Sequence, residues 1–272
     1  MSATGAIPLR VTYIGHATLL LEIGGVRVLT DPNFEPRLGG ILPRVSAPGI
    51  ALSELPALDA VLLTHGHADH LSFATLDALP RAVPIHAPPS IARWLGRRQK
   101  RDVRGMVPGD CVMIGSVELR VAAARHAGAR YVVDWWRGAA NMYLLDSGEH
   151  SCFFAGDTAL TPYTHTLVEE RLRSRGRRLD VALLPIGHAP WWKPGFRRNH
   201  LTPEDALALF ERLDARVLVP YHWGTFRHLT AGPFDAIDRL RARLDGYDRR
   251  ADVRILAPGE AFEQPAGARA MV

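Results

Sequence analysis

The stretch DAVLLTHGHADH, residues 59–70, joins an apolar run directly to three histidines and an aspartate. Its first half, residues 59–64, has the composition of a buried strand. The stretch that follows it, LSFATLDAL at residues 71–79, has the character of a helix. The histidine-rich turn is therefore expected between a buried strand and a helix, as in an α/β fold.

The titratable residues of this turn have a spacing that suits metal binding. In an extended segment His65 and His67 point to the same side, so both can bind one ion. A turn into the helix would bring Asp69 and His70 toward a second position. Buried strand ends rarely carry so many titratable groups without a ligand. We therefore predict two adjacent metal ions at the end of this strand.

Three further residues of ligand type follow apolar runs later in the chain. His126 follows ELRVAAAR, Asp157 follows CFFAG, and His222 follows ARVLVPY. Each is the first residue of ligand type beyond its predicted strand. With these residues in this order, the chain resembles the metallo-β-lactamase superfamily, whose signature HxHxDH follows a buried strand. The resemblance covers nearly the whole chain.

The resemblance implies a role for each of these residues. One metal would be bound by His65, His67 and His126, a second by Asp69, His70 and His222, and Asp157 would bridge the two. Asp31, after the third predicted strand, would support the site without binding metal. His16 lies in a Gly-His-Ala turn between two predicted strands, where support of the ligands, packing and substrate contact are all open to it.

The rest of the chain alternates apolar strands with amphipathic helices, and no linker divides it. Strands are expected at 11–15, 18–23, 26–30, 59–64, 83–88, 110–114, 117–124, 140–145, 151–155, 180–187 and 215–224, and helices at 71–79, from 91, at 164–175, from 202 and at 234–244. We predict one α/β domain over residues 1–272, a four-layer αββα sandwich of the metallo-β-lactamase type. Periodicity alone would also fit a doubly wound sheet.

Composition narrows the function classes. The 272 residues are 47% hydrophobic and 22% charged, which is typical of a packed domain and excludes a disordered chain. No apolar stretch approaches the about 18 residues of a membrane span, and the first twenty residues lack a signal-peptide pattern. Two cysteines are too few for a disulfide framework. A cytoplasmic location is therefore expected.

The net charge of +5 could indicate a nucleic-acid partner. Among the 33 basic residues, however, only Lys100 and Lys193 are lysines, so arginine enrichment runs through the whole chain. This distribution indicates a compositional bias, and a nucleic-acid role is not expected.

Two ions about 3.5 to 4 Å apart can share a hydroxide, which makes hydrolysis the expected reaction. All the ligands offer nitrogen or oxygen, so zinc is the expected metal, and manganese and iron also fit them. Asp69 is expected to orient the hydroxide in addition to binding metal.

Local motifs indicate the branch of the superfamily. The bridging position is an aspartate, Asp157, and no cysteine, which argues against β-lactam cleavage. IGHATLLLE, FFAGDT, HLTPEDAL and HWGTF resemble the branch that contains N-acyl phosphatidylethanolamine phospholipase D and lies near the ascorbate-6-phosphate lactonases. The resemblance implies a phospholipase D-like hydrolase of a lipid or smaller phosphodiester. A lactonase or other carboxylic-ester hydrolase is the alternative, and a non-catalytic metal-binding protein is a third reading.

Several residues are expected to shape the substrate pocket. By the resemblance His200 would contact the substrate phosphate or the leaving group, and Arg197 and Arg198 beside it would serve a phosphoryl substrate. The remaining candidates for the pocket are His188, Trp191, Trp192 and Tyr221. The long segment 32–58 could form one wall, and an exposed apolar patch beside it would indicate contact with a membrane surface. The sequence specifies no oligomeric state.

Overall fold

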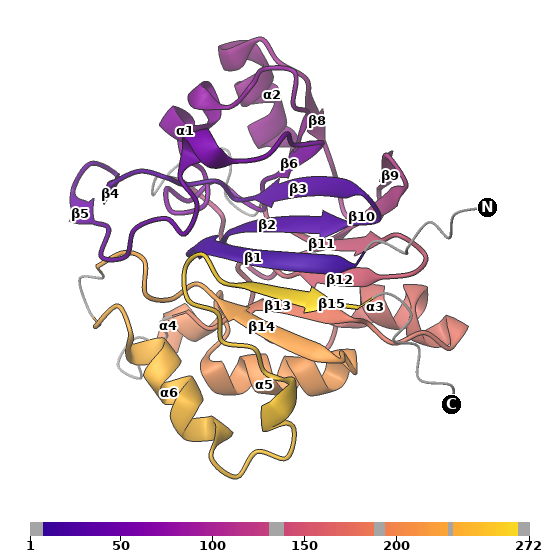
Figure 1. Ribbon diagram of the computed structural model, residues 1–272. Helices are drawn as coiled ribbons and strands as arrows, with labels where there is room; N and C mark the ends of the chain where they lie inside the picture. Colours follow the sequence, from indigo (N-terminus) through magenta and orange to yellow (C-terminus); the bar gives the residue numbers. More distant parts are fainter. Residues whose placement is uncertain (1–7, 131–138, 188–193, 228–230, 266–272) are drawn as a thin grey trace.

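A computed structural model of the chain describes residues 8–130, 139–187, 194–227 and 231–265. Two large β-sheets stack in the middle of this described part, with helices above and below them (Figure 1). The order of helix, sheet, sheet and helix confirms the predicted αββα sandwich.

The first sheet has seven strands in the order β15-β1-β2-β3-β6-β7-β8. Its strands are β1 (Leu9–Gly15), β2 (Thr18–Ile23), β3 (Val26–Thr30), β6 (Ala60–Leu62), β7 (Ile85–Ala87), β8 (Val103–Gly105) and β15 (Ala261–Gln264). The first three form the expected antiparallel meander, and β6, β7 and β8 continue it in parallel.

The second sheet has six strands in the order β14-β13-β12-β11-β10-β9. They are β9 (Cys111–Ile114), β10 (Val117–Ala123), β11 (Asn141–Asp146), β12 (Ser151–Phe154), β13 (Val181–Pro185) and β14 (Val217–Tyr221). The last three run parallel to one another, so their carboxyl ends lie at one edge of the sheet.

Helices cover the outer faces of both sheets. They are α1 (Phe73–Ala78), α2 (Pro89–Gln99), α3 (Thr166–Arg171), α4 (Pro194–Arg197), α5 (Pro203–Leu213) and α6 (Asp235–Leu244). Helix α5 begins as the sequence predicts: the Thr202 hydroxyl accepts from the Asp205 N–H at 3.1 Å, and the Asp205 carboxylate accepts from the Thr202 N–H at 3.2 Å. Pro203 takes the first helical position, where its missing N–H costs nothing.

The strands are apolar on both faces, because each sheet packs against the other sheet on one face and against helices on the opposite face. In β2, Leu19 and Leu21 belong to the core between the sheets, whereas Leu20 packs on the opposite side with Ile91 and Leu95 of α2. Side chains of α5 join the core of the second sheet from its outer side. This double burial explains why the strand segments read as nearly continuous apolar runs.

The structure adds elements that the sequence pattern did not predict. Within the segment 32–58, β4 (Arg37–Leu38) and β5 (Leu42–Pro43) form a short hairpin, and a 3₁₀ turn covers Leu52–Glu54. The edge strands β8 and β15 were also not anticipated, because they are short and carry few buried side chains. The helix predicted at 164–175 is α3 followed by a 3₁₀ turn at Arg173–Arg175.

Candidate metal centre

Strand ends deliver the predicted ligands to one place. His65, His126, Asp157 and His222 each follow a strand, namely β6, β10, β12 and β14. Two groups of four residues bring these and neighbouring ligand atoms together, and within each group all atoms lie within 4.8 Å of one another. Asp31, His65 and His70 form a third, overlapping group of the same kind. The two groups of four form the candidate metal centre.

The first group consists of His65, His67, His126 and Asp157. His126 Nε2 lies 3.0 Å from His67 Nδ1, a separation typical of two atoms that face one ion. The other ring nitrogen of His126, Nδ1, lies 2.8 Å from the Asn199 carbonyl oxygen, which can accept a hydrogen bond from it. That bond leaves Nε2 of His126 available as a metal ligand.

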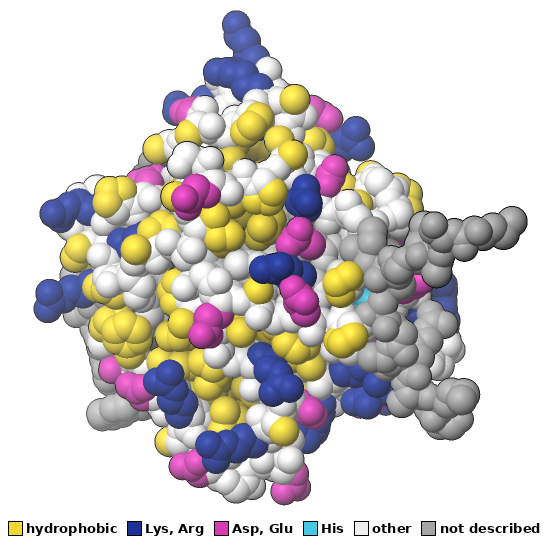
Figure 2. Space-filling view, in the orientation of Figure 1, with side chains coloured by type: hydrophobic (Ala, Val, Ile, Leu, Met, Phe, Trp, Pro, Cys, Tyr) yellow, Lys and Arg dark blue, Asp and Glu magenta, His cyan; other side chains and the backbone are white. Residues whose placement is uncertain are grey.

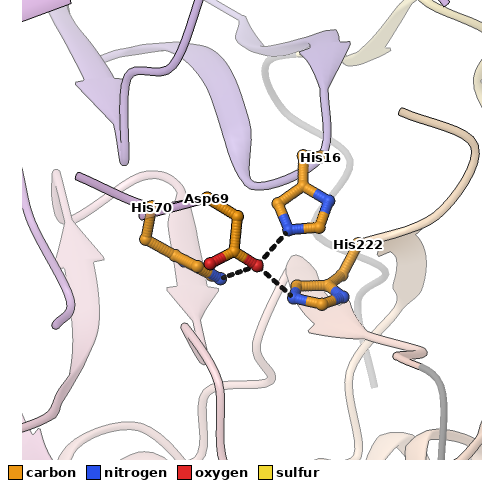
Figure 3. Close-up of side chains that lie close together, drawn as sticks. All are labelled: His16, Asp69, His70 and His222. Carbon is orange, nitrogen blue, oxygen red and sulfur yellow. Dashed lines mark hydrogen bonds and ion pairs between the residues drawn. The ribbon is translucent and has the colours of Figure 1, made fainter. Parts of the chain in front are cut away.

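The second group consists of His16, Asp69, His70 and His222. Figure 3 shows the Asp69 carboxylate facing the three imidazole rings. Its Oδ2 atom lies 2.8 Å from His16 Nε2, 3.6 Å from His222 Nε2 and 3.8 Å from His70 Nε2. The structure therefore places His16 among the ligand atoms, closer to them than its sequence position alone indicated.

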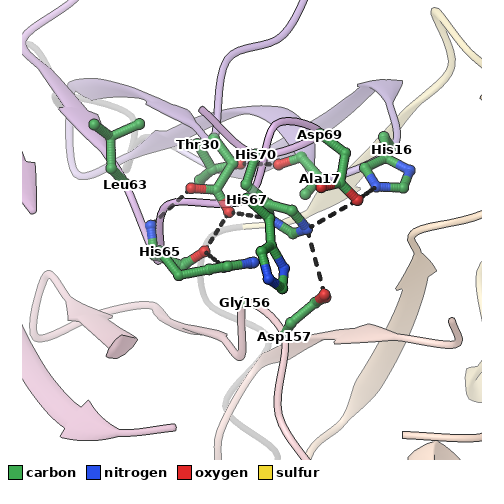
Figure 4. A network of polar contacts seen from close by, with 12 residues as sticks. His16, Ala17, Thr30, Leu63, His65, His67, Asp69, His70, Gly156 and Asp157 are labelled. Carbon is green, nitrogen blue, oxygen red and sulfur yellow. Dashed lines mark hydrogen bonds and ion pairs between the residues drawn. The ribbon is translucent and has the colours of Figure 1, made fainter. Parts of the chain in front are cut away.

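Asp157, a member of the first group, also lies close to residues of the second. Its Oδ2 atom is 3.5 Å from His70 Nε2 (Figure 4). The same oxygen is 3.3 Å from His222 Nε2 and 4.0 Å from His126 Nε2. The Nε2 atom of His200 lies 3.3 Å from the same oxygen, so the structure brings this residue to the centre as well.

Unpartnered buried atoms test whether a metal fits. Four atoms of the centre are buried without a hydrogen-bond partner, namely Nε2 of His65, His70 and His222 and Oδ1 of Asp157. Buried polar atoms normally have partners, because leaving one unpaired costs about 1–3 kcal/mol. Imidazole nitrogens and carboxylate oxygens converging in this way fit one or more divalent cations.

Asp31 supports the centre from outside it. Its carboxylate accepts hydrogen bonds from the Thr64 N–H at 2.7 Å and the Thr64 hydroxyl at 2.6 Å, and it lies 2.7 Å from His70 Nδ1. With both Asp31 oxygens engaged, the residue orients His70 and the turn at Thr64. The supporting role of Asp31 stays a prediction, and these contacts are its geometric basis.

Backbone strain is concentrated at the same place. His16, Asp31 and His222 have positive φ angles of 55°, 35° and 70°, a region that non-glycine residues rarely adopt. Gly156, just before Asp157, has φ +55°, and a Cβ there would lie 2.6 Å from the Thr64 side chain. The loop that carries Asp157 therefore approaches the histidine turn as closely as only glycine permits.

The pKa shifts of the side chains in the centre favour the binding of cations. Burial lowers the pKa of His65 well below its ordinary value and that of His126 to about 3, which favours the neutral ring that binds metal. Burial alone would raise the pKa of Asp157, but His222 and His70 hold it well below its ordinary value. Conversely, burial opposes a charged His222, but Asp157 and Asp69 raise its pKa to about 9. The buried carboxylates are thus stabilised by nearby positive charge, which a proton or a metal ion can supply.

A cavity of about 280 Å³ opens onto the centre. The metal-centre residues in its lining are His16, His67, Asp69, Asp157, His200 and His222. Leu38 and Leu42 of the β4–β5 hairpin contribute to the wall, as predicted for the segment 32–58. Thr225 and Phe226 also line the cavity; they lie in the HWGTF motif, whose sequence signalled the branch but not this role.

The prediction for Tyr221 needs correction. Its side chain is fully buried, and its hydroxyl donates to the Gly156 carbonyl at 2.5 Å, away from the cavity. As the last residue of β14 it turns into the core, where its ring lies 5.3 Å from that of Phe154. The other pocket candidates, His188, Trp191 and Trp192, lie outside the described residues.

The arginines next to His200 are not among the described residues that line the cavity. The guanidinium of Arg197 binds the Asp205 carboxylate through two hydrogen bonds, and its side chain is 63% exposed. Arg198 is exposed and is absent from the described cavity lining. On the face shown in Figure 2, basic and acidic side chains are interspersed, in agreement with an arginine bias rather than a basic stripe.

Within the described ranges, no helix has the length and apolar character needed to cross a bilayer. Cys152 is buried, as the apolar run around it predicts, and Cys111 is exposed; neither is in a disulfide.

Comparison with known proteins finds a matching family model and similar hydrolases. The model of the beta-lactamase superfamily domain matches residues 26–223. A UPF0173 metal-dependent hydrolase of Deinococcus radiodurans is 30% identical over 94% of this chain and 99% of its own length. N-acyl-phosphatidylethanolamine-hydrolyzing phospholipase D 1 of Caenorhabditis elegans is 26% identical over 93% of this chain and 75% of its own length.

Solved structures share the fold. Igni18, a metallo hydrolase from Ignicoccus hospitalis, superposes with a TM-score of 0.70 at 22% identity and covers 95% of this chain and 99% of its own. An isothiocyanate hydrolase from Delia radicum gut bacteria gives a TM-score of 0.73 at 22% identity, covering 94% and 100%. These two proteins resemble the chain in architecture.

Proposed function

The chain belongs to the metallo-β-lactamase superfamily and is a metal-dependent hydrolase, and from this premise we propose that it hydrolyses phosphodiester bonds with two zinc ions. The observation that carries the proposal is the position of Asp157, whose buried carboxylate belongs to one group of ligand atoms and lies close to the other, beside a cavity. Similarity to a phospholipase D over 93% of the chain supports the phosphodiester substrate.

Two bound cations would supply Lewis acidity and would lower the pKa of a water molecule to about 7. The protein's own residues hold the reacting groups. Asp69 faces both the second ligand group and the cavity, so its carboxylate can accept a hydrogen bond from the attacking water and orient it. Nitrogen and oxygen ligands favour zinc, and manganese or iron would fit the same set.

His200 is proposed to act on the substrate. Its ring lines the cavity, with 19% of the side chain exposed, and its Nε2 lies 3.3 Å from Asp157 Oδ2. From this position an imidazole can donate a hydrogen bond to a phosphoryl oxygen or to the leaving-group oxygen. Because it lies near both the cavity and Asp157, His200 is the proposed catalytic residue that is not itself a proposed metal ligand.

The substrate is proposed to be a lipid or another small phosphodiester. Leu38 and Leu42, in the segment that forms one wall of the cavity, line it with apolar side chains. An apolar cavity wall favours a lipid over a hydrophilic metabolite. Cytoplasmic location remains our expectation from the sequence.

A carboxylic ester or lactone is the second candidate. Phosphoryl transfer gains from cations around three oxygens, whereas an acyl centre needs one oxyanion clamp. Arg197 is held by Asp205, and among the described residues that line the cavity Arg227 is the one arginine. This scarcity of cations favours the acyl alternative.

The test compares initial rates on a chromogenic phosphodiester and on a lactone of similar size. Zinc-loaded wild type is compared with Asp157→Ala under identical conditions. Faster, zinc-dependent turnover of the phosphodiester that disappears in the variant supports the proposal. Preference for the lactone overturns the phosphodiester assignment and favours the ester-hydrolase alternative.

A further inference from the structure

The lining of the cavity consists of two chemically different sets of residues. One set is the metal-centre residues, and the rest of the described lining is largely apolar. It consists of Leu38, Leu42, Trp223, Phe226, Pro233 and Ala236, together with glycines, Thr225 and Arg227. These side chains come from the β4–β5 hairpin and from residues 223–227 and 232–236, which are distant from the hairpin in sequence.

Backbone pairing fastens these two segments to each other. The Val45 N–H donates to the Thr225 carbonyl at 2.8 Å, and the Arg227 N–H donates to the Pro43 carbonyl at 3.0 Å. Between them Arg44 forms an antiparallel bridge with Phe226. In Figure 1 the hairpin accordingly lies beside the chain that follows β14. The apolar wall is therefore a built feature with defined geometry.

The side chain of Arg44 strengthens the same junction. Its guanidinium donates to the carbonyls of Glu35 at 2.9 Å and Asn33 at 2.6 Å, and it lies 4.7 Å from the centre of the Phe226 ring. A cation over an aromatic face is attractive, more so when partly buried as here. Phe226 in turn contacts His16 edge-on, with ring centroids 5.5 Å apart. The wall is thus positioned directly against the metal centre.

The side-chain polar atoms of Thr225 and Trp223 in this wall are already hydrogen-bonded. Thr225 Oγ1 accepts from the His16 N–H at 2.6 Å and donates to the Trp223 carbonyl at 3.2 Å. Trp223 Nε1 donates to the Pro220 carbonyl at 3.2 Å. A hydroxyl-rich substituent placed here would lose its hydrogen bonds to water without replacing them, which is costly. An apolar substituent would gain by leaving water.

We propose that the substrate carries an alkyl, acyl or aryl substituent that packs against Leu38 and Leu42 while its scissile group lies at the metals. Polyhydroxylated substrates such as sugar-derived lactones are rejected by the same wall. This inference rests on the proposed function in one respect, namely that the scissile bond lies at the metal centre. Leu38 and Leu42, paired across the β4–β5 hairpin, then determine specificity.

Binding of alkylphosphonates to the zinc-loaded protein, measured by calorimetry, tests the inference without turnover. Affinity is expected to rise from methyl- to butyl- to hexylphosphonate, by up to about fourfold per fully buried methylene. Propylphosphonate should bind more tightly than 2,3-dihydroxypropylphosphonate, which has the same carbon skeleton. Equal affinities across the series, or no binding of hexylphosphonate, would overturn the inference.

Variants of the hairpin locate the effect. Leu38→Ser and Leu42→Ser should weaken hexylphosphonate binding about fivefold or more and leave methylphosphonate nearly unchanged, since only the longer chain reaches the wall. Ile41→Ser is the matched control, because Ile41 lies on the same hairpin, is 77% exposed and does not line the cavity. An equal loss in the control would contradict the assignment to Leu38 and Leu42.

Turnover of methyl and hexyl p-nitrophenyl phosphate separates this inference from the proposed function. If neither compound is hydrolysed but hexylphosphonate still binds through Leu42, the phosphodiester proposal fails and the apolar subsite stands. If both are hydrolysed at equal rates and the phosphonates show no dependence on chain length, the subsite fails and the phosphodiester proposal stands.

Discussion

The Asp31 carboxylate lies 2.7 Å from Nδ1 of His70, and both side chains are fully buried. The contact favours a proton on Nδ1 of His70, so that Nε2 turns its lone pair toward Asp69 and Asp157. Thr64 donates to both oxygens of Asp31 and thereby fixes the carboxylate itself. One buried acid thus sets both the tautomer and the direction of a proposed ligand.

Asp31→Asn is expected to weaken zinc binding about 10–100-fold, because the amide no longer accepts from both His70 and Thr64. Competition with a chromogenic chelator measures this affinity. Asp238→Asn serves as control, since Asp238 forms an ion pair with exposed Arg241 on α6 and belongs to none of the groups of ligand atoms. Unchanged affinity in Asp31→Asn would show that the contact does not support the metal.

Gly156→Ala should destabilise the protein by about 1–3 kcal/mol more than Gly148→Ala, because overpacking of this kind is costly. Both glycines have positive φ angles, 55° and 84°, so both variants carry backbone strain. A Cβ at Gly156 would meet Thr64 at 2.6 Å, whereas one at Gly148 would meet nothing within 4 Å. Urea denaturation gives the two free energies of unfolding, and equal values would refute the close approach.

His200→Gln should lower kcat about 100-fold or more while leaving the metal content at the wild-type level. The reason is that His200 faces the cavity beside Asp157 but belongs to neither group of proposed ligands. Rates on the chromogenic phosphodiester and metal analysis of the same sample provide both readouts. Loss of metal together with activity would make His200 a ligand instead.

Glu204 should give a pH-dependent contribution to stability. Burial alone would raise its pKa, but hydrogen bonds from Arg239 and Arg243, each 2.8 Å long, lower it to about 2. A lowered folded-state pKa stabilises the fold above the ordinary value of 4.5, and this contribution is lost as pH falls toward about 2. Both arginines are half exposed, so the contribution is only about 0.5–1 kcal/mol at pH 7.

Unfolding of wild type and Glu204→Gln in urea, at pH 7 and at steps down to pH 3, measures this contribution. The difference in unfolding free energy should shrink as pH falls below 4.5. Asp238→Asn again provides the control, with a small difference throughout. A difference that grows on acidification would contradict the sign of the effect.

The layered fold and the ligand groups could be predicted because their signals are local. Apolar runs covered on both faces mark the strands, and His65, Asp157 and His222 directly follow three of them. The wall of the cavity could not be predicted in this way. It depends on backbone pairing between Arg44 and Phe226, which no local pattern records.

Two residues show the same limit at single positions. Tyr221 borders a proposed ligand in sequence, but as a strand residue beside His222 it points into the core. His16 reaches Asp69 because its backbone N–H donates to the hydroxyls of Tyr13 and Thr225. Thr225 lies more than 200 residues away in sequence. Such directions follow from side-chain alternation and long-range contacts, not from the motif itself.

The metal content of the purified protein tests the central claim most directly. Elemental analysis should find close to two zinc, manganese or iron ions per chain in the wild type, far fewer in Asp157→Ala, and an intermediate content in Asp31→Ala. Loss of the bridge leaves two cations repelling each other, whereas loss of Asp31 only weakens support for one ligand. A metal-free wild type, or a greater loss in Asp31→Ala than in Asp157→Ala, would contradict the account.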